Sequence, residues 1–122
     1  MVGFIKRNGT CYKNLETIKI LYSSFVRSIL EFSSVVWDPK TQQNKDKIEK
    51  IQERFLKYLY CKIFTYYPFE IIYKELLVGF EIMGLKNRRC LAKLIFLRDI
   101  LNNKILDSNI LTCIQFRVPT FL

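Results

Sequence analysis

The chain has 122 residues, half of them hydrophobic and 15% aromatic, a composition that excludes a disordered polymer and allows one buried core. With only 4 Gly and 3 Pro it has few turn residues, which favours helices over a many-stranded sheet. Its 20 Lys and Arg against 11 Asp and Glu give a net charge of +9, which favours polyanions (nucleic acid or an anionic membrane surface) over the acidic faces of protein partners.

The first predicted element is an amphipathic helix that begins at Leu15 and ends near Trp37. Asn14 is the expected N-cap, and Pro39 disfavours helical geometry at Asp38. Apolar side chains recur along the helix at alternating spacings of three and four residues, which predicts one buried stripe made of Leu15, Ile18, Tyr22, Phe25, Ile29, Phe32 and Val36.

The second predicted helix covers residues 44–64 and carries two faces. Its apolar arc consists of Ile48, Ile51, Phe55, Tyr58, Leu59 and Lys62, and a separate basic stripe consists of Lys47, Lys50, Arg54 and Lys57. The basic stripe is a candidate for phosphate contacts along a nucleic-acid backbone. Alternatively it is a solvated face, in which Asp46 and Glu53 pair with the cations four residues further on. Gln52 falls inside the apolar arc, where a buried amide needs hydrogen-bond partners.

Three more helices complete the prediction: a short one over residues 70–77, a long one over 85–102 and a short one over 107–114, with Asp107 or Ser108 as its cap. Apolar residues occur on nearly every side of the helix over 85–102, so it is expected to be central and buried. The predicted fold is therefore all-α, a small bundle of three long helices and two short ones in a single domain over 1–122. Its expected core includes Phe25, Trp37, Ile51, Phe55, Ile95 and Phe96.

The start of the third long helix is the second candidate phosphate site, with Lys86, Arg88 and Arg89. Positive side chains there oppose the helix dipole, and a bound phosphate would remove the conflict. The alternative is that the arginines pair with Glu75 or Glu81.

Other side chains also allow two interpretations. Aromatic residues gather around the end of the second helix and either stack on bases or pack between helices; they are Tyr58, Tyr60, Phe64, Tyr66, Tyr67 and Phe69. Arg27 and Glu31 lie four residues apart in the first helix and are expected to form an intrahelical ion pair.

Catalytic and metal-binding patterns are absent from the sequence. The four aspartates (Asp38, Asp46, Asp99 and Asp107) are never adjacent, there is no histidine, and no glycine-rich phosphate loop occurs. The four cysteines form no Cys-x-x-Cys pair and lie among apolar neighbours; they are Cys11, Cys61, Cys90 and Cys113. We therefore expect no catalytic residue, no metal and no cofactor, and reduced thiols of the cytoplasm or nucleus. The first residues do not resemble a signal peptide, and charges interrupt the most apolar segment, so no membrane partner is expected.

Several short motifs, in order, resemble the segment that follows the polymerase core in reverse transcriptases of non-LTR (LINE-type, jockey-like) retrotransposons. They are Phe4-Ile5 with Arg7-Asn8, then Leu21-Tyr22, Val26-Arg27, Leu30-Glu31, Trp37 and Pro39, then Ile48-Glu49, Ile51-Gln52 and Phe55, then Leu85 with Arg88-Arg89, and last Phe116 with Val118-Pro119. The resemblance covers nearly the whole chain.

This resemblance implies a non-catalytic fragment of a transposable element's RNA-directed DNA polymerase, which helps to hold RNA or an RNA–DNA hybrid. The basic side chains would then be backbone contacts, which position the nucleic acid without specifying its sequence. The parent polyprotein's other domains would be further partners. Two alternatives remain open: a helical protein-interaction scaffold, and a truncated transposon relic with no selected function.

Overall fold

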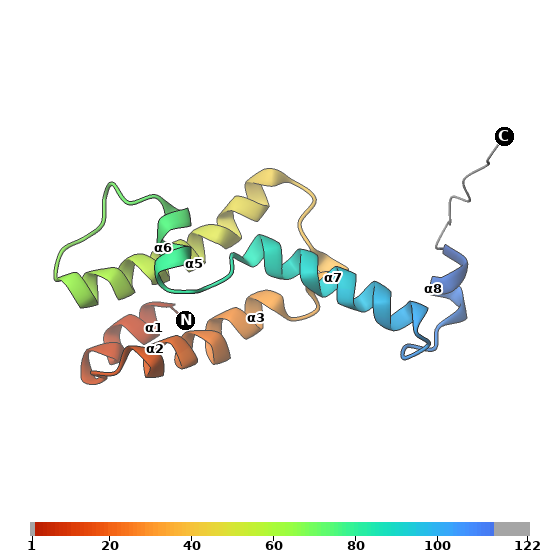
Figure 1. The fold of residues 1–122 in the computed structure, drawn as a ribbon, viewed down its shortest axis with the longest axis horizontal. Helices are drawn as coiled ribbons and strands as arrows, with labels where there is room; N and C mark the ends of the chain where they lie inside the picture. The colour runs from red at the N-terminus through yellow and green to blue at the C-terminus, as the bar shows by residue number, and fades with distance from the viewer. Residues whose placement is uncertain (1, 114–122) are drawn as a thin grey trace.

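The computed structural model describes residues 2–113 of the chain, with only the backbone described at residue 111. Helices take up 75% of the described residues, and no strand occurs among them, which confirms the all-α prediction. Figure 1 shows the helices packed into a body from which the C-terminal part of the described chain projects. Within residues 2–113 no helix is both long and apolar enough to cross a membrane.

The N-terminal half is a series of short helical segments. They are α1 (Val2–Asn8), a 3₁₀ turn (Gly9–Cys11), α2 (Leu15–Tyr22), a π-helical turn (Ser23–Arg27), α3 (Ser28–Glu31) and α4 (Ser34–Trp37). α1 was not predicted from the sequence. The cap of α2 is as predicted, because the Asn14 side chain accepts a hydrogen bond from the Glu16 N–H at 2.9 Å.

The helix predicted from Leu15 to Trp37 is interrupted in two ways. The π-helical turn contains an extra residue per turn, so the buried stripe continues through Ile18, Tyr22 and Val26, at four-residue spacing. Phe25 is therefore exposed, contrary to the prediction. Further on, Ser33 has φ 52°, in the left-handed region, which separates α3 from α4.

The C-terminal half agrees more closely with the predicted elements. It consists of α5 (Gln42–Phe64), α6 (Tyr73–Gly79), α7 (Leu85–Leu101) and α8 (Ser108–Cys113). Asp107 caps α8, because its Oδ1 atom accepts a hydrogen bond from the Asn109 N–H at 2.9 Å. α6 begins three residues later than predicted. The tail over 115–122 lies outside the described residues.

The core lies between α1, α2, the π-helical turn, α5 and α6. Its buried side chains are Ile5, Ile18, Tyr22, Val26, Phe55, Leu56, Leu59 and Leu76. The Tyr22 and Phe55 rings stack with centroids 4.0 Å apart. Phe55 is thus in the core as predicted, and Ile51 packs against it. Trp37 and Ile95 are exposed, so their predicted burial is wrong, and Phe96 is half-buried.

α7 is not central, contrary to the prediction. Only Leu85, Arg89 and Ile100 are fully buried along it. The helix leaves the body beside α4 and continues past the ends of the other long helices, with α8 at its far end (Figure 1). Apolar residues on every side of a helix thus do not imply burial here, because the helix extends beyond the core that could cover them.

Candidate nucleic-acid interface

The basic stripe lies on the outer face of α5. The four fully buried residues of this helix, Gln52, Phe55, Leu56 and Leu59, lie on one side of it. Lys47, Lys50 and Arg54 are exposed and lie on the opposite side at about 100° per residue. From the first to the last of these three is about 10 Å along the helix axis. α5 is long and anchored by its core side, so it holds these cations in a fixed row.

The acidic neighbours of the stripe neutralise only one of its cations. Lys57 Nζ lies 2.8 Å from Glu53 Oε1, and this hydrogen bond raises the pKa of Lys57. The predicted pair between Asp46 and Lys50 is not formed; Asp46 instead accepts a hydrogen bond from Gln42 Nε2 at 2.7 Å. Among residues 2–113, no carboxylate lies within ion-pair distance of Lys47, Lys50 or Arg54. These three cations are available to an external anion.

The cations at the start of α7 have a different environment. Arg88 forms a two-pronged ion pair with Glu31, in which the second prong joins a terminal guanidinium nitrogen to Glu31 Oε2 at 3.0 Å. That hydrogen bond holds the pKa of Arg88 above its usual range. Arg89, only 3% exposed, donates from Nε to Asp38 Oδ1 at 2.9 Å. The expected partners Glu75 and Glu81 are therefore wrong.

The two carboxylates that bind these arginines come from α3 and from the end of α4. Asp38 also accepts a hydrogen bond from Lys93. Burial alone would raise the pKa of Asp38, but the hydrogen bonds and charges of Lys93 and Arg89 outweigh burial and lower it. The pair of Arg27 with Glu31 expected within the first helix is not formed, because Glu31 binds Arg88 instead. Arg88 and Arg89 thus attach α7 to the N-terminal half of the protein.

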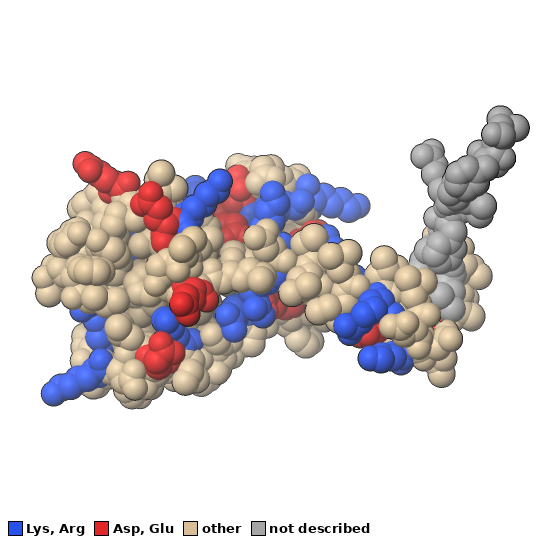
Figure 2. Space-filling view, in the orientation of Figure 1, with Lys and Arg blue, Asp and Glu red and all other residues tan. Residues whose placement is uncertain are grey.

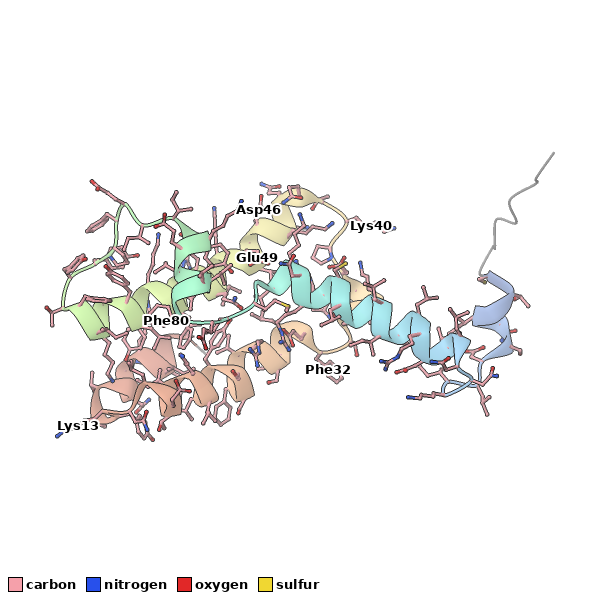
Figure 3. The ribbon with its side chains drawn as sticks, in the orientation of Figure 1. Lys13, Phe32, Lys40, Asp46, Glu49 and Phe80 are labelled. Atoms are coloured by element: carbon pink, nitrogen blue, oxygen red, sulfur yellow. The ribbon has the colours of Figure 1, made fainter. Side chains whose placement is uncertain are left out.

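The N-terminus of α7 binds an anion from within the chain. The Lys86 N–H donates a hydrogen bond to Glu49 Oε1, and the Tyr73 hydroxyl donates to Glu49 Oε2 at 2.6 Å. Figure 3 shows Glu49 on α5 beside α6 and the start of α7. Burial and the hydrogen bond to Glu49 raise the pKa of Tyr73. Glu49 thus occupies the position expected for a phosphate, while the Lys86 side chain stays exposed.

The polar residue in the apolar arc has a structural role. Gln52 is fully buried; its Oε1 atom accepts from the Tyr22 hydroxyl at 3.0 Å, and its Nε2 donates to the Met83 carbonyl at 3.0 Å. This amide joins α2, α5 and the segment before α7. Its position within the arc was the signal for a buried polar contact, although the sequence does not identify the partners.

The aromatic group divides between packing and exposure. Tyr58 and Tyr60 pack against the core, and the Tyr60 hydroxyl lies 2.7 Å from that of Tyr66. Tyr66, Tyr67 and Phe69, in the connector after α5, are largely exposed. Phe64, the last residue of α5, is half exposed. The packing interpretation therefore holds for Tyr58 and Tyr60, and base stacking remains a prediction for Phe64 and the connector.

The cysteine environment differs from the expectation. All four cysteines are free, but Cys11, Cys90 and Cys113 are exposed and do not act as small core residues. Within the described part of the chain, no group of three or more His, Cys, Asp or Glu side chains is placed to hold a metal ion.

Comparison with models of known families, with curated proteins and with solved structures finds no match to this chain. The resemblance to non-LTR reverse transcriptases therefore stays a prediction. The structure brings Lys47, Lys50 and Arg54 together on one exposed face and separates them from Arg88 and Arg89, which bind internal carboxylates. Such a face can attract phosphates through charge.

Proposed function

We propose that the chain is a non-catalytic nucleic-acid-binding segment that contacts the phosphates of RNA or an RNA–DNA hybrid through the outer face of α5. In this proposal it derives from the post-catalytic segment of a non-LTR retrotransposon reverse transcriptase, as a fragment of a larger polyprotein. It would act beside that polyprotein's other domains, in the cytoplasm or nucleus, and the polymerase chemistry would belong to the parent protein.

The observation that supports this proposal is the set of three exposed cations on α5 that no carboxylate of residues 2–113 neutralises. The three residues lie within about 10 Å along the helix axis, which is close enough for them to contact neighbouring phosphates of one nucleic-acid strand. The net charge of +9 adds long-range attraction for a polyanion. Because Arg88 and Arg89 have structural partners, we assign binding to Lys47, Lys50 and Arg54, with Lys57 beside them.

The test measures binding of the purified chain to single-stranded RNA and to an RNA–DNA hybrid across a salt series. The test variant carries Lys47→Ala, Lys50→Ala and Arg54→Ala. Three lost phosphate contacts should reduce the slope of log affinity against log salt by about 2 to 3. Affinity at low salt should fall at least tenfold.

A matched control removes three exposed lysines elsewhere, through Lys13→Ala, Lys40→Ala and Lys74→Ala. Lys13 and Lys40 lie at opposite ends of the body (Figure 3). Both variants lose the same positive charge, so a general charge effect would weaken them equally. Equal loss in the two variants, or no binding by the parent chain, would reject the α5 face as the site.

A second candidate function is the helical protein-interaction scaffold, favoured by the exposed leucines of α7. Leu91, Leu94 and Leu101 are between 46% and 58% exposed. In this case the chain would bind protein with little dependence on salt, because apolar burial is not screened by ions. The relic alternative predicts aggregation of a chain with a poorly closed core.

A further inference from the structure

A hollow of about 330 Å³ lies where α1, the π-helical turn, α3 and α5 meet. α1 lies beside α2 and α5 there (Figure 1). Apart from one arginine, the residues that line the hollow are Val2, Gly3, Val26, Ile29, Leu30 and Ile51. Its volume is at the lower end of the range of about 300–1,000 Å³ typical of small-molecule sites, so it suits one small ring system.

Arg54 joins this hollow to the free cations of α5. It lines the hollow and is exposed, and no carboxylate of residues 2–113 lies within ion-pair distance of it. Lys50 lies one turn earlier on the same outer face, about 6 Å away along the helix axis. The aliphatic stem of an arginine packs on apolar surface while its guanidinium stays in water. The hollow therefore opens beside two cations that are available to an anion.

The π-helical turn shapes one wall of the hollow. Val26 belongs to this turn and is only 3% exposed, so it lies at the bottom, whereas Ile29 of α3 is 58% exposed and lies at the rim. π-helical turns are rare and are frequently found at functional sites. The wall that this turn provides is therefore a second reason to expect a ligand here.

An apolar hollow beside free cations is complementary to a ligand that combines a flat ring with an anionic group. A nucleotide of single-stranded RNA is such a ligand, because its unstacked base has apolar faces and is joined to a phosphate. We propose that the hollow receives one unstacked base of single-stranded RNA, whose phosphate binds Arg54 or Lys50. This inference rests on the proposed contact between α5 and phosphates. It also selects the form of the RNA, because a base in an RNA–DNA hybrid would first have to leave its stack.

Charge favours this hollow over a larger one between α5, α6 and the start of α7. The larger hollow, of about 790 Å³, is lined in part by Asp46, Glu49 and Glu81, with Lys74 and Lys86. Three carboxylates against two lysines make its surroundings net negative, which repels a phosphate. No carboxylate of residues 2–113 lines the hollow beside Arg54.

Two single-stranded oligomers of equal length measure the contribution of the base: an RNA, and an abasic chain with the same ribose phosphates. Their charge is the same, so phosphate contacts alone would bind them equally. The parent chain should bind the intact RNA at least about fivefold more tightly. Equal affinity would overturn the base site and leave phosphate binding by α5 standing. Binding of neither oligomer would reject both proposals.

Gly3→Leu tests where the base lies. Gly3 lines the hollow, and a Cβ atom added to it would meet nothing within 4 Å, so a leucine has room there and narrows the hollow. This variant should bind the intact RNA no more tightly than the abasic chain. Its affinity for the abasic chain and for an RNA–DNA hybrid should equal that of the parent, which also shows that the α5 face is folded.

Gly79→Leu is the matched control. Gly79 also lies in a helix with open space around an added Cβ atom, and it lines a different hollow, beside Tyr60 and Phe64. This variant should keep the parent's preference for intact RNA. A preference that Gly3→Leu retains, or that Gly79→Leu loses to the same extent, would overturn the proposal.

Photocrosslinking of the parent chain to RNA that contains 4-thiouridine tests the same site without a variant. The modified base should crosslink to residues that line the hollow, such as Gly3, Ile29 and Ile51. Crosslinks confined to other residues, for example Tyr60 and Phe64, or no crosslinks at saturating RNA, would contradict the proposed base site.

Discussion

At the scale of single residues, buried polar side chains join distant segments of this chain in addition to the apolar core. Gln52 receives the Tyr22 hydroxyl and donates to the Met83 carbonyl, and it is fully buried. Removing one member of such a contact leaves the other desolvated and unpaired, which costs more than the hydrogen bond contributes. The sequence identified Gln52 as unusual, but its partners are 30 and 31 residues away and leave no local pattern.

We expect Gln52→Leu to lower the free energy of unfolding by about 1–3 kcal/mol, although leucine suits an apolar core. The double variant Tyr22→Phe with Gln52→Leu should recover part of that loss, because it removes the unpaired hydroxyl as well. Urea unfolding followed by circular dichroism measures both. A Gln52→Leu chain as stable as the parent would show that this amide contributes nothing to the fold.

At the scale of elements, some helix ends followed from local signals, whereas the interruption of the first predicted helix and the environment of α7 did not. The Asn14 cap, the Asp107 cap and the start of α7 were each predictable from a few neighbouring residues. The change of the buried face at the π-helical turn was not predictable. The apolar residues fit a buried stripe both in a regular α-helix and in a helix with one extra residue in a turn. The burial of α7 depends on where the core ends, and the spacing of apolar residues in the sequence does not show which part of the helix the core covers.

The attachment of α7 predicts an effect of acid on stability. The pKa of Asp38 is lower in the folded state than in the unfolded state, where it is about 3.9. The ionised carboxylate therefore stabilises the folded state fully above about pH 3.9, and this stabilisation is lost as the pH falls through the folded-state pKa. Asp38→Asn should lower the free energy of unfolding by about 3 kcal/mol at pH 7, because it leaves Arg89 buried without a counter-charge.

Thermal unfolding from pH 7 to pH 3 provides the measurement. The difference in stability between the parent and Asp38→Asn should shrink as pH falls below about 4. Glu31→Gln, at the more exposed pair with Arg88, is the comparison and should cost less. A difference between parent and Asp38→Asn that is constant over this range would contradict the role assigned to the Asp38 carboxylate.

At the scale of the whole molecule, positive charge has two distinct uses. At the start of α7 it is internal and structural, with carboxylates from α3 and from the end of α4 as partners 57 and 51 residues away in sequence. On the outer face of α5, Lys47, Lys50 and Arg54 are exposed, and no carboxylate of residues 2–113 pairs with them. From the sequence, the basic residues of α5 and those at the start of α7 were both candidate phosphate sites. The sequence shows where cations cluster, but it does not show which carboxylates lie beside them in the fold. The near face in Figure 2 mixes positive and negative residues.

The most direct test of the central claim is to map, residue by residue, where RNA contacts the protein. Amide chemical shifts recorded during titration of the full chain with single-stranded RNA provide this map. Our account predicts that the largest changes occur around Lys47, Lys50 and Arg54, with little change at Arg88 and Arg89. Changes centred on the start of α7, or none at saturating RNA, would contradict it.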